Sequence, residues 1–213
     1  MDRRELLKLV TLATGGVLIG GQMFLSGCKN DPKLGGVNFS AEDISFLDEV
    51  GETILPKTNT PGAKEAQVGE FMKTMVNDCY DANDQKTFHE GIKKLDEACE
   101  KMHKTGFMEA SPEQKQSLLI SLDKEAKEYQ KKKNDFDGEQ KKKEKEEKEK
   151  GNKDFKKERM EPHYFTMFKQ LTITGFFTSK IGATEALRYM PVPGKYDGAF
   201  PYKKGDKAWA ATG

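Results

Sequence analysis

Residues 68–76 read VGEFMKTMV, and this short stretch decides the fold class. Its apolar residues follow the period of a helix, at positions i, i+3, i+4, i+7 and i+8: Val68, Phe71, Met72, Met75 and Val76. Such a stripe predicts an amphipathic helix with one buried face. Nowhere does the sequence alternate apolar and polar residues over the length of a strand, and it contains no internal repeat. We therefore predict an all-α fold.

Two helices are predicted on either side of this stretch. The earlier one begins at Ser40, with Asp43 completing a capping box, and ends before Pro56, whose ring cannot continue a helix. The later one begins at about Asp84 and carries an apolar residue every three or four positions. Gly106 is its predicted stop.

A fourth helix is predicted from the sequence SPEQ at 111–114, a capping box with proline in the first helical position. Order returns at Glu161 with a further helical stripe, which includes Phe165, Phe168 and Leu171. A short helix from about Ala183 to Tyr189 follows. The chain then ends in a long irregular tail, in which glycine and proline recur.

Residues 130–159 interrupt this pattern, because lysine and glutamate dominate them and only two phenylalanines intervene. So little apolar surface cannot offset the entropy of ordering the chain, so we predict a disordered, solvated insertion. A partly helical insertion is the alternative, since Glu–Lys pairs four residues apart support a helix. The helical domain is thus predicted in two parts, 40–129 and 160–213.

Residues 1–27 have the features of an export signal. Arg3 and Arg4 precede an apolar run and match the twin-arginine motif of folded-protein export. The sequence LSGC at 25–28 resembles the lipobox of bacterial lipoproteins, which predicts lipidation of Cys28 and a short tether over 28–39. An uncleaved membrane anchor is the alternative. The expected location is the bacterial cell envelope, lipid-anchored and periplasm-facing.

The charge balance excludes one class of partner. The chain has 36 basic and 35 acidic residues, and without 1–27 the count is 33 of each. A neutral mature chain gives no reason to expect nucleic-acid binding. Cys79 and Cys99 remain after lipidation, either as a disulfide in an oxidising compartment or as two buried thiols on separate helices.

The sequence lacks the motifs of catalytic and cofactor sites. It has no glycine-rich phosphate loop, no haem attachment motif and no serine nucleophile turn. Cys99 and His103 are four residues apart, but no further metal ligand accompanies them. Asp78, Asp81 and Asp84 lack the glycine and glutamate of a calcium loop, which favours a helix end and cap. We expect no catalytic, cofactor or metal site in this chain.

Two regions resemble the gluconate 2-dehydrogenase subunit 3 family, the small subunit of membrane-bound flavin dehydrogenases. They are FLDEVGETILPKTNTPGAKEAQVGEFM at 46–72 and HYFTMFKQLTITGFFTSKIGATEALRYMPVPGKYDG at 163–198. The resemblance implies a large subunit that carries FAD and oxidises a sugar or sugar acid, and a cytochrome c subunit that takes the electrons. It further implies that this chain escorts the large subunit through twin-arginine export. The alternative is a free-standing helical envelope lipoprotein, acting as an adaptor without an enzyme partner.

The resemblance also directs attention to residues that contact the large subunit. The candidates lie in the loop after the first helix and in the second motif region with its tail: Pro56, Thr60, Pro61, Gly62, Phe176, Phe177, Pro193, Gly194, Tyr196, Gly198 and Trp209. Aromatic anchors often dominate interface energy, and an irregular tail cannot bury its rings in a helix of its own. The alternative is that these rings pack onto the parent domain.

Overall fold

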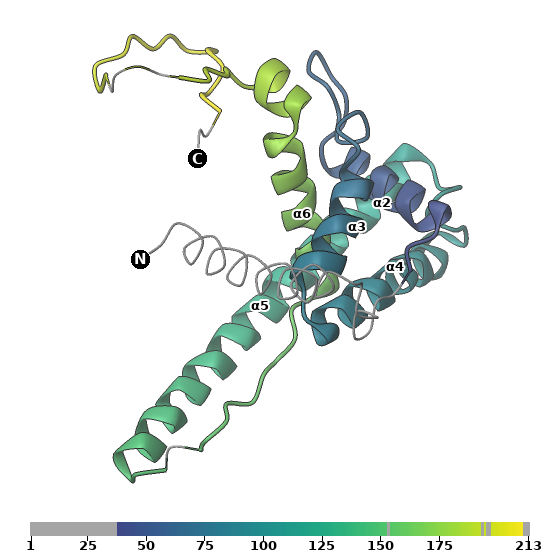
Figure 1. The fold of residues 1–213 in the computed structure, drawn as a ribbon. Coiled ribbons are helices and arrows are strands. Elements are labelled where there is room, and N and C mark those ends of the chain that lie inside the picture. The colour runs from purple at the N-terminus through teal and green to yellow at the C-terminus, as the bar shows by residue number, and fades with distance from the viewer. Residues whose placement is uncertain (1–37, 153, 193, 195–196, 211–213) are drawn as a thin grey trace, which may run out of the picture. The chain divides into compact units, whose positions relative to one another are not determined.

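The computed structural model describes residues 38–210, except 153, 193, 195 and 196. The predicted export signal with Arg3, Arg4 and Cys28 therefore lies outside the described residues, as do Pro193 and Tyr196. The described part of the chain is helical, as predicted. Its elements are α2 (Ala41–Ile54), α3 (Val68–Cys79), α4 (Ala82–His103), α5 (Pro112–Glu149), α6 (Tyr164–Thr178) and a turn of π-helix, η1 (Gly182–Ala186) (Figure 1).

Both predicted capping boxes are confirmed. The Ser40 hydroxyl accepts from the Asp43 amide at 3.1 Å, and the Asp43 carboxylate accepts from the Ser40 amide at 2.9 Å. Ser111 and Gln114 make the same reciprocal pair at the start of α5. These bonds satisfy amides that a helix start leaves without an intrahelical partner, which is why the pattern was readable in the sequence.

The bounds of α4 differ from the prediction by a few residues. Asp81 caps the helix by accepting from the amides of Asn83 and Asp84, and Asp78 lies in the last turn of α3, as predicted for a helix end and cap. The helix ends at His103, where Lys104 takes the left-handed conformation with φ of 62°. The stop therefore lies two residues before the predicted Gly106, on a residue type that rarely adopts this conformation.

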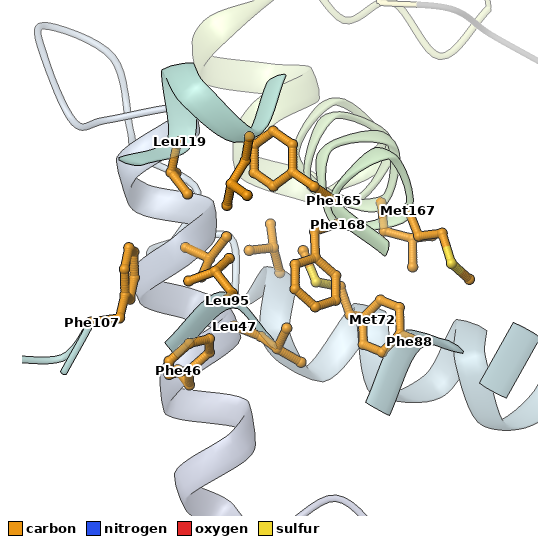
Figure 2. Packing of buried hydrophobic residues seen from close by; sticks show 14 of the residues in the cluster. Phe46, Leu47, Met72, Phe88, Leu95, Phe107, Leu119, Phe165, Met167 and Phe168 are labelled. Carbon is orange, nitrogen blue, oxygen red and sulfur yellow. The ribbon is translucent and has the colours of Figure 1, made fainter. Parts of the chain in front are cut away.

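The core forms around α6. Phe168 packs edge-to-face on Phe88 of α4, with ring centroids 4.7 Å apart, and Leu47 of α2 and Met72 of α3 are also fully buried in this cluster (Figure 2). Burying a side chain of this size stabilises the fold by roughly 1.5–3 kcal/mol. Gly175 lets α3 approach closely, because a Cβ there would lie 2.6 Å from the Phe71 ring.

The two remaining cysteines stay apart. Cys79 ends α3 and is exposed, whereas Cys99 lies in α4 and is buried, and both are free thiols. No disulfide joins them, and the alternative of two buried thiols on separate helices holds for Cys99 but is wrong for Cys79, which is exposed. Burial raises the pKa of Cys99, which keeps it in the neutral, poorly nucleophilic form.

The charged insertion is ordered, which corrects the prediction of disorder over 130–159. α5 continues to Glu149, and the chain then returns along its second half (Figure 1). Gln140, which is buried, exchanges two hydrogen bonds with Glu158 on the returning chain. The partly helical alternative therefore holds for 130–149. We call residues 130–159 the charged arm.

Arg159 fixes the base of the charged arm to α4. Its guanidinium binds the carboxylates of Asp81 and Asp84 and lies 3.2 Å from that of Glu161. These carboxylates hold the pKa of Arg159 above its ordinary value. The prediction missed this clamp because the four residues lie in two segments about 75 positions apart.

Candidate partner-binding surface

The loop after α2 is held from beneath by one carboxylate. Glu52 accepts from the backbone amide of Lys57 at 2.8 Å and from that of Lys64 at 2.9 Å. Gly62 passes directly over this carboxylate, because a Cβ on Gly62 would lie 2.3 Å from a Glu52 oxygen. A side chain at position 62 would displace the Glu52 carboxylate, so the packing of the loop itself favours glycine there. Gly62, a predicted contact residue, is buried.

Two neighbouring carboxylates fix the base of the same loop. Asp48 accepts from the Gly69 amide at 2.8 Å and so binds the start of α3. Burial raises the pKa of Asp48, and the Gly69 amide partly opposes that shift. Glu49 lies 3.1 Å from Lys64 and 2.7 Å from the buried ammonium of Lys115 on α5. The hydrogen bond from Lys115 is the main cause that lowers the pKa of Glu49.

The outer face of the loop offers little apolar surface. Pro56 is exposed, whereas Thr60 and Pro61 are half-buried. Lys57 and Glu65 form an exposed ion pair across it. Of the four loop residues predicted to contact a partner, Pro56 alone is fully presented to solvent.

α6 separates the two predicted phenylalanines. Phe176 is 4% exposed and belongs to the core cluster, which corrects its assignment to a partner surface. Phe177 is 39% exposed, and Ile173 is exposed one turn before it. A helix places adjacent residues on different faces, so only one of the two rings can reach the core.

An exposed isoleucine of α5 extends this apolar face. α5 and α6 run antiparallel side by side, since Tyr129 bonds to the carbonyl of Glu161 while Asp123 pairs with Lys169 at 2.5 Å. Ile120 lies one turn before Asp123, and Ile173 lies one turn after Lys169, which brings both to the same side. We call Ile120, Ile173 and Phe177 the α6 patch.

The tail folds back on the end of η1 through one arginine. The Arg188 amide donates to the Ala208 carbonyl at 2.8 Å, the Ala210 amide donates to the Arg188 carbonyl at 2.7 Å, and the Arg188 Nε donates to the Lys207 carbonyl at 2.7 Å. The guanidinium carbon lies 4.5 Å from the centre of the Trp209 ring and 5.6 Å from that of Phe200. We call this arrangement the clasp. No local sequence pattern identifies Arg188.

Around the clasp, the tail exposes large apolar side chains. Val192 is 79% exposed and Tyr202 is 72% exposed, while Tyr189, Met190 and Phe200 are about half exposed. We call these five residues the tail surface. Trp209, at 44% exposed, packs on Arg188 and Phe200 rather than in the core. Gly194 has a φ of 75°, which favours glycine, and Gly198 is exposed in a turn.

A groove of about 490 Å³ lies between α2 and α4. Its apolar lining includes Phe46, Ile92 and Met108, and Glu100 and Glu109 stand among its acidic residues. Among the described residues, no group of three His, Cys, Asp or Glu side chains could hold a metal ion. None of the described helices combines the length and apolar character needed to cross a membrane.

The comparisons place the chain in a family. The family model described as gluconate 2-dehydrogenase subunit 3 matches residues 41–194. No curated protein and no solved structure matches the chain. The match runs from α2 through η1 into the tail, includes the loop over Glu52, and stops before Phe200 and Trp209. Because the match spans well over half of the sequence, the chain belongs to the gluconate 2-dehydrogenase subunit 3 family.

Proposed function

We propose that this chain is a non-catalytic subunit that binds, stabilises and escorts the FAD-bearing large subunit of a flavin-dependent dehydrogenase. Membership of a family of dehydrogenase subunits implies a dehydrogenase partner. The observation that carries the proposal is the exposed apolar surface of the α6 patch and the tail surface. Monomeric proteins rarely leave apolar patches of this kind uncovered, and aromatic side chains are typical anchors of protein interfaces.

The cofactor and the electron acceptor in this proposal come from the family resemblance, and the export route and the anchor come from sequence patterns. FAD belongs to the large subunit, and a cytochrome c subunit receives the electrons. Arg3 and Arg4 direct the folded pair to twin-arginine export, and lipidation of Cys28 then anchors the complex to a membrane of the bacterial envelope. This division of labour explains why a chain without a cofactor motif carries a signal for folded cargo.

Co-purification tests the partnership. The chain is purified from membranes in mild detergent, and we expect a flavoprotein with bound FAD to accompany it. Replacing both Ile173 and Phe177 with Asp should reduce the recovered flavin at least tenfold, because two charges in an interface would be buried without partners. Met102→Asp is the matched control, since Met102 is a similarly exposed apolar residue on α4. Purification of the wild-type chain without flavin would favour the free-standing adaptor.

Export is tested separately by replacing Arg3 and Arg4 with lysine. The substitution keeps the charge but removes the guanidinium pair, which ammonium groups do not replace. Both this chain and the flavoprotein should then remain in the cytoplasm. Normal delivery of the flavoprotein to the envelope would contradict the escort role. Cys28→Ser should leave export intact but abolish labelling with a fatty-acid probe.

A further inference from the structure

We propose that the clasp holds the tail surface in a preformed shape for docking on the dehydrogenase subunit, and that Arg188 is the positioning residue of this interface. This inference rests on the proposed function and deepens it by naming the surface. The occupant is a protein surface that combines an apolar groove with carboxylates.

Hydrogen bonds at Arg188 and Lys207 close the tail into a loop. Three hydrogen bonds join Arg188 to Lys207, Ala208 and Ala210, and the Lys207 ammonium donates to the carbonyl of Glu185. Ala210 is buried at the base of the clasp. A free tail would lose its conformational freedom on binding, whereas a closed tail has lost most of it already. The clasp therefore favours association without itself touching the core.

The closed tail presents large apolar side chains to solvent. Val192 and Tyr202 are the two most exposed large apolar residues of the described chain, and both lie in the segment that the clasp closes. Phe200 stacks edge-on against Trp209, with centroids 5.5 Å apart, and keeps about half of its surface in solvent. Tyrosine, tryptophan and arginine are enriched among residues that dominate interface energy.

The net charge of the tail distinguishes between the partners that could bind the tail surface. Residues 188–210 contain five basic and two acidic residues, a net charge of +3. The helical body, 38–129 with 160–187, contains 13 basic and 21 acidic residues, a net charge of −8. The two tail carboxylates are engaged locally, since Asp197 accepts from the Ala199 amide and Asp206 from the Lys203 amide. The tail surface is therefore apolar with a positive rim.

An acidic protein surface fits this distribution better than the other occupants. An anionic membrane would attract the tail and the charged arm, which has a net charge of +4, but would repel the helical body, whose net charge is larger and negative. A second copy of this chain could offer its acidic body to the tail, but that head-to-tail contact joins two different surfaces and leads to rings or open chains of many copies. Binding to the dehydrogenase subunit that the family implies involves neither repulsion by a membrane nor a head-to-tail contact between copies.

The test measures binding of the mature chain to the purified flavoprotein large subunit. Residues 28–213 carry Cys28→Ser in every variant, so that no acyl chain contributes. The compact unit Val37–Gly213 lies entirely within this segment. We expect Arg188→Ala to weaken binding at least tenfold and to speed tryptic cleavage after Lys203 and Lys204, with unchanged helical circular dichroism.

Two further variants distinguish the positioning role of Arg188 from its charge and from direct contact by the tail surface. Arg188→Lys keeps the charge but cannot reproduce the Nε hydrogen bond or the planar stacking, so it should bind as weakly as Arg188→Ala. The double variant Val192→Asp with Tyr202→Asp should weaken binding as much but leave tryptic cleavage slow, because the clasp is intact. Raising the salt concentration should weaken wild-type binding.

The outcomes are distinct. If the wild-type chain does not bind the flavoprotein, the proposed function fails and this inference fails with it. If the wild-type chain binds and Arg188→Ala binds equally well, only this inference is overturned. It is also overturned if the Val192→Asp, Tyr202→Asp variant keeps full affinity for the flavoprotein but loses binding to phosphatidylglycerol vesicles or loses self-association in sedimentation.

Discussion

The loop over Glu52 and the tail closed by Arg188 were both predicted to meet a partner, yet they are built in opposite ways. One carboxylate of α2, that of Glu52, holds the loop from beneath and packs against its buried Gly62, and two further carboxylates of α2 fix the base of the loop. A single arginine holds the tail, whose apolar side chains remain in solvent. A distinctive sequence motif can thus record the demands of packing, while the surface able to bind lies elsewhere.

The loop and the tail also differ in which parts of the protein their stabilising bonds reach. The contacts of Asp48, Glu49 and Glu52 reach the loop, α3 and α5, so they couple the loop to the folding of the whole domain. The bonds of Arg188 end within the tail, and the bond of Lys207 ends on the Glu185 carbonyl of η1. Changes in the loop should therefore lower global stability, and changes in the tail should mainly alter association.

The largest effect is expected from Gly62→Ala. The added methyl group would displace the Glu52 carboxylate and disrupt its bonds to the amides of Lys57 and Lys64. Charge-assisted hydrogen bonds contribute roughly 1.5–3 kcal/mol each, so we expect a loss of about 3 kcal/mol in urea unfolding. Gly138→Ala on α5 is the control, because its methyl group would meet nothing within 4 Å. It should raise stability by about 0.5–1 kcal/mol.

A smaller effect, dependent on pH, is expected at the base of the loop. Glu49→Gln leaves the buried Lys115 without its countercharge and should cost about 1–3 kcal/mol at pH 7. Because the pKa of Glu49 is lowered in the folded state, its contribution is present above the unfolded value of 4.5 and is lost as the pH falls further. The stabilities of wild type and variant should therefore converge below about pH 4.5.

The matched control for that measurement is Glu65→Gln, which removes an exposed ion pair with Lys57 in the same loop. Exposed pairs contribute little, so this variant should follow the wild type at every pH. A constant gap between wild type and Glu49→Gln from pH 7 to pH 4 would show that ionisation of Glu49 does not support the loop.

The smallest effect on stability is expected from Trp209→Ala. Trp209 contacts the guanidinium of Arg188 and the ring of Phe200 at the surface, and exposed cation–π contacts contribute roughly 0.5–1 kcal/mol. Thermal unfolding should therefore change by only a few degrees, while affinity for the flavoprotein falls. A loss of stability as large as that of Gly62→Ala would show that the tail belongs to the same cooperative unit as the loop.

The helix starts were predictable because their determinants are local. Ser40 with Asp43, and Ser111 with Gln114, form their bonds within one helical turn, so the pattern alone identifies them. The all-α fold followed from apolar stripes of the same short range. The stop of α4 at Lys104 was less predictable, because no glycine occupies the left-handed position.

The candidate surface was harder to predict, since its determinants join distant residues. Glu52 acts on residues up to 12 positions away, and Arg188 acts on residues about 20 positions away. The order of the charged arm likewise depends on Gln140 meeting Glu158 and on Arg159 meeting the start of α4. The low apolar content of this segment predicted disorder, because composition does not reveal hydrogen bonds and ion pairs between distant polar residues.

The pairing of a helix with an extended chain in the charged arm limits which insertions and deletions the arm can accept. The helical segment rises about 1.5 Å per residue, whereas an extended chain covers about 3.3 Å per residue. Insertions and deletions that keep Gln140 opposite Glu158 can lengthen or shorten the tip freely. Changes between that pair and the base must instead come in matched sets, with about two helical residues for each residue of the returning chain. Homologues whose arms differ in length should carry such paired changes.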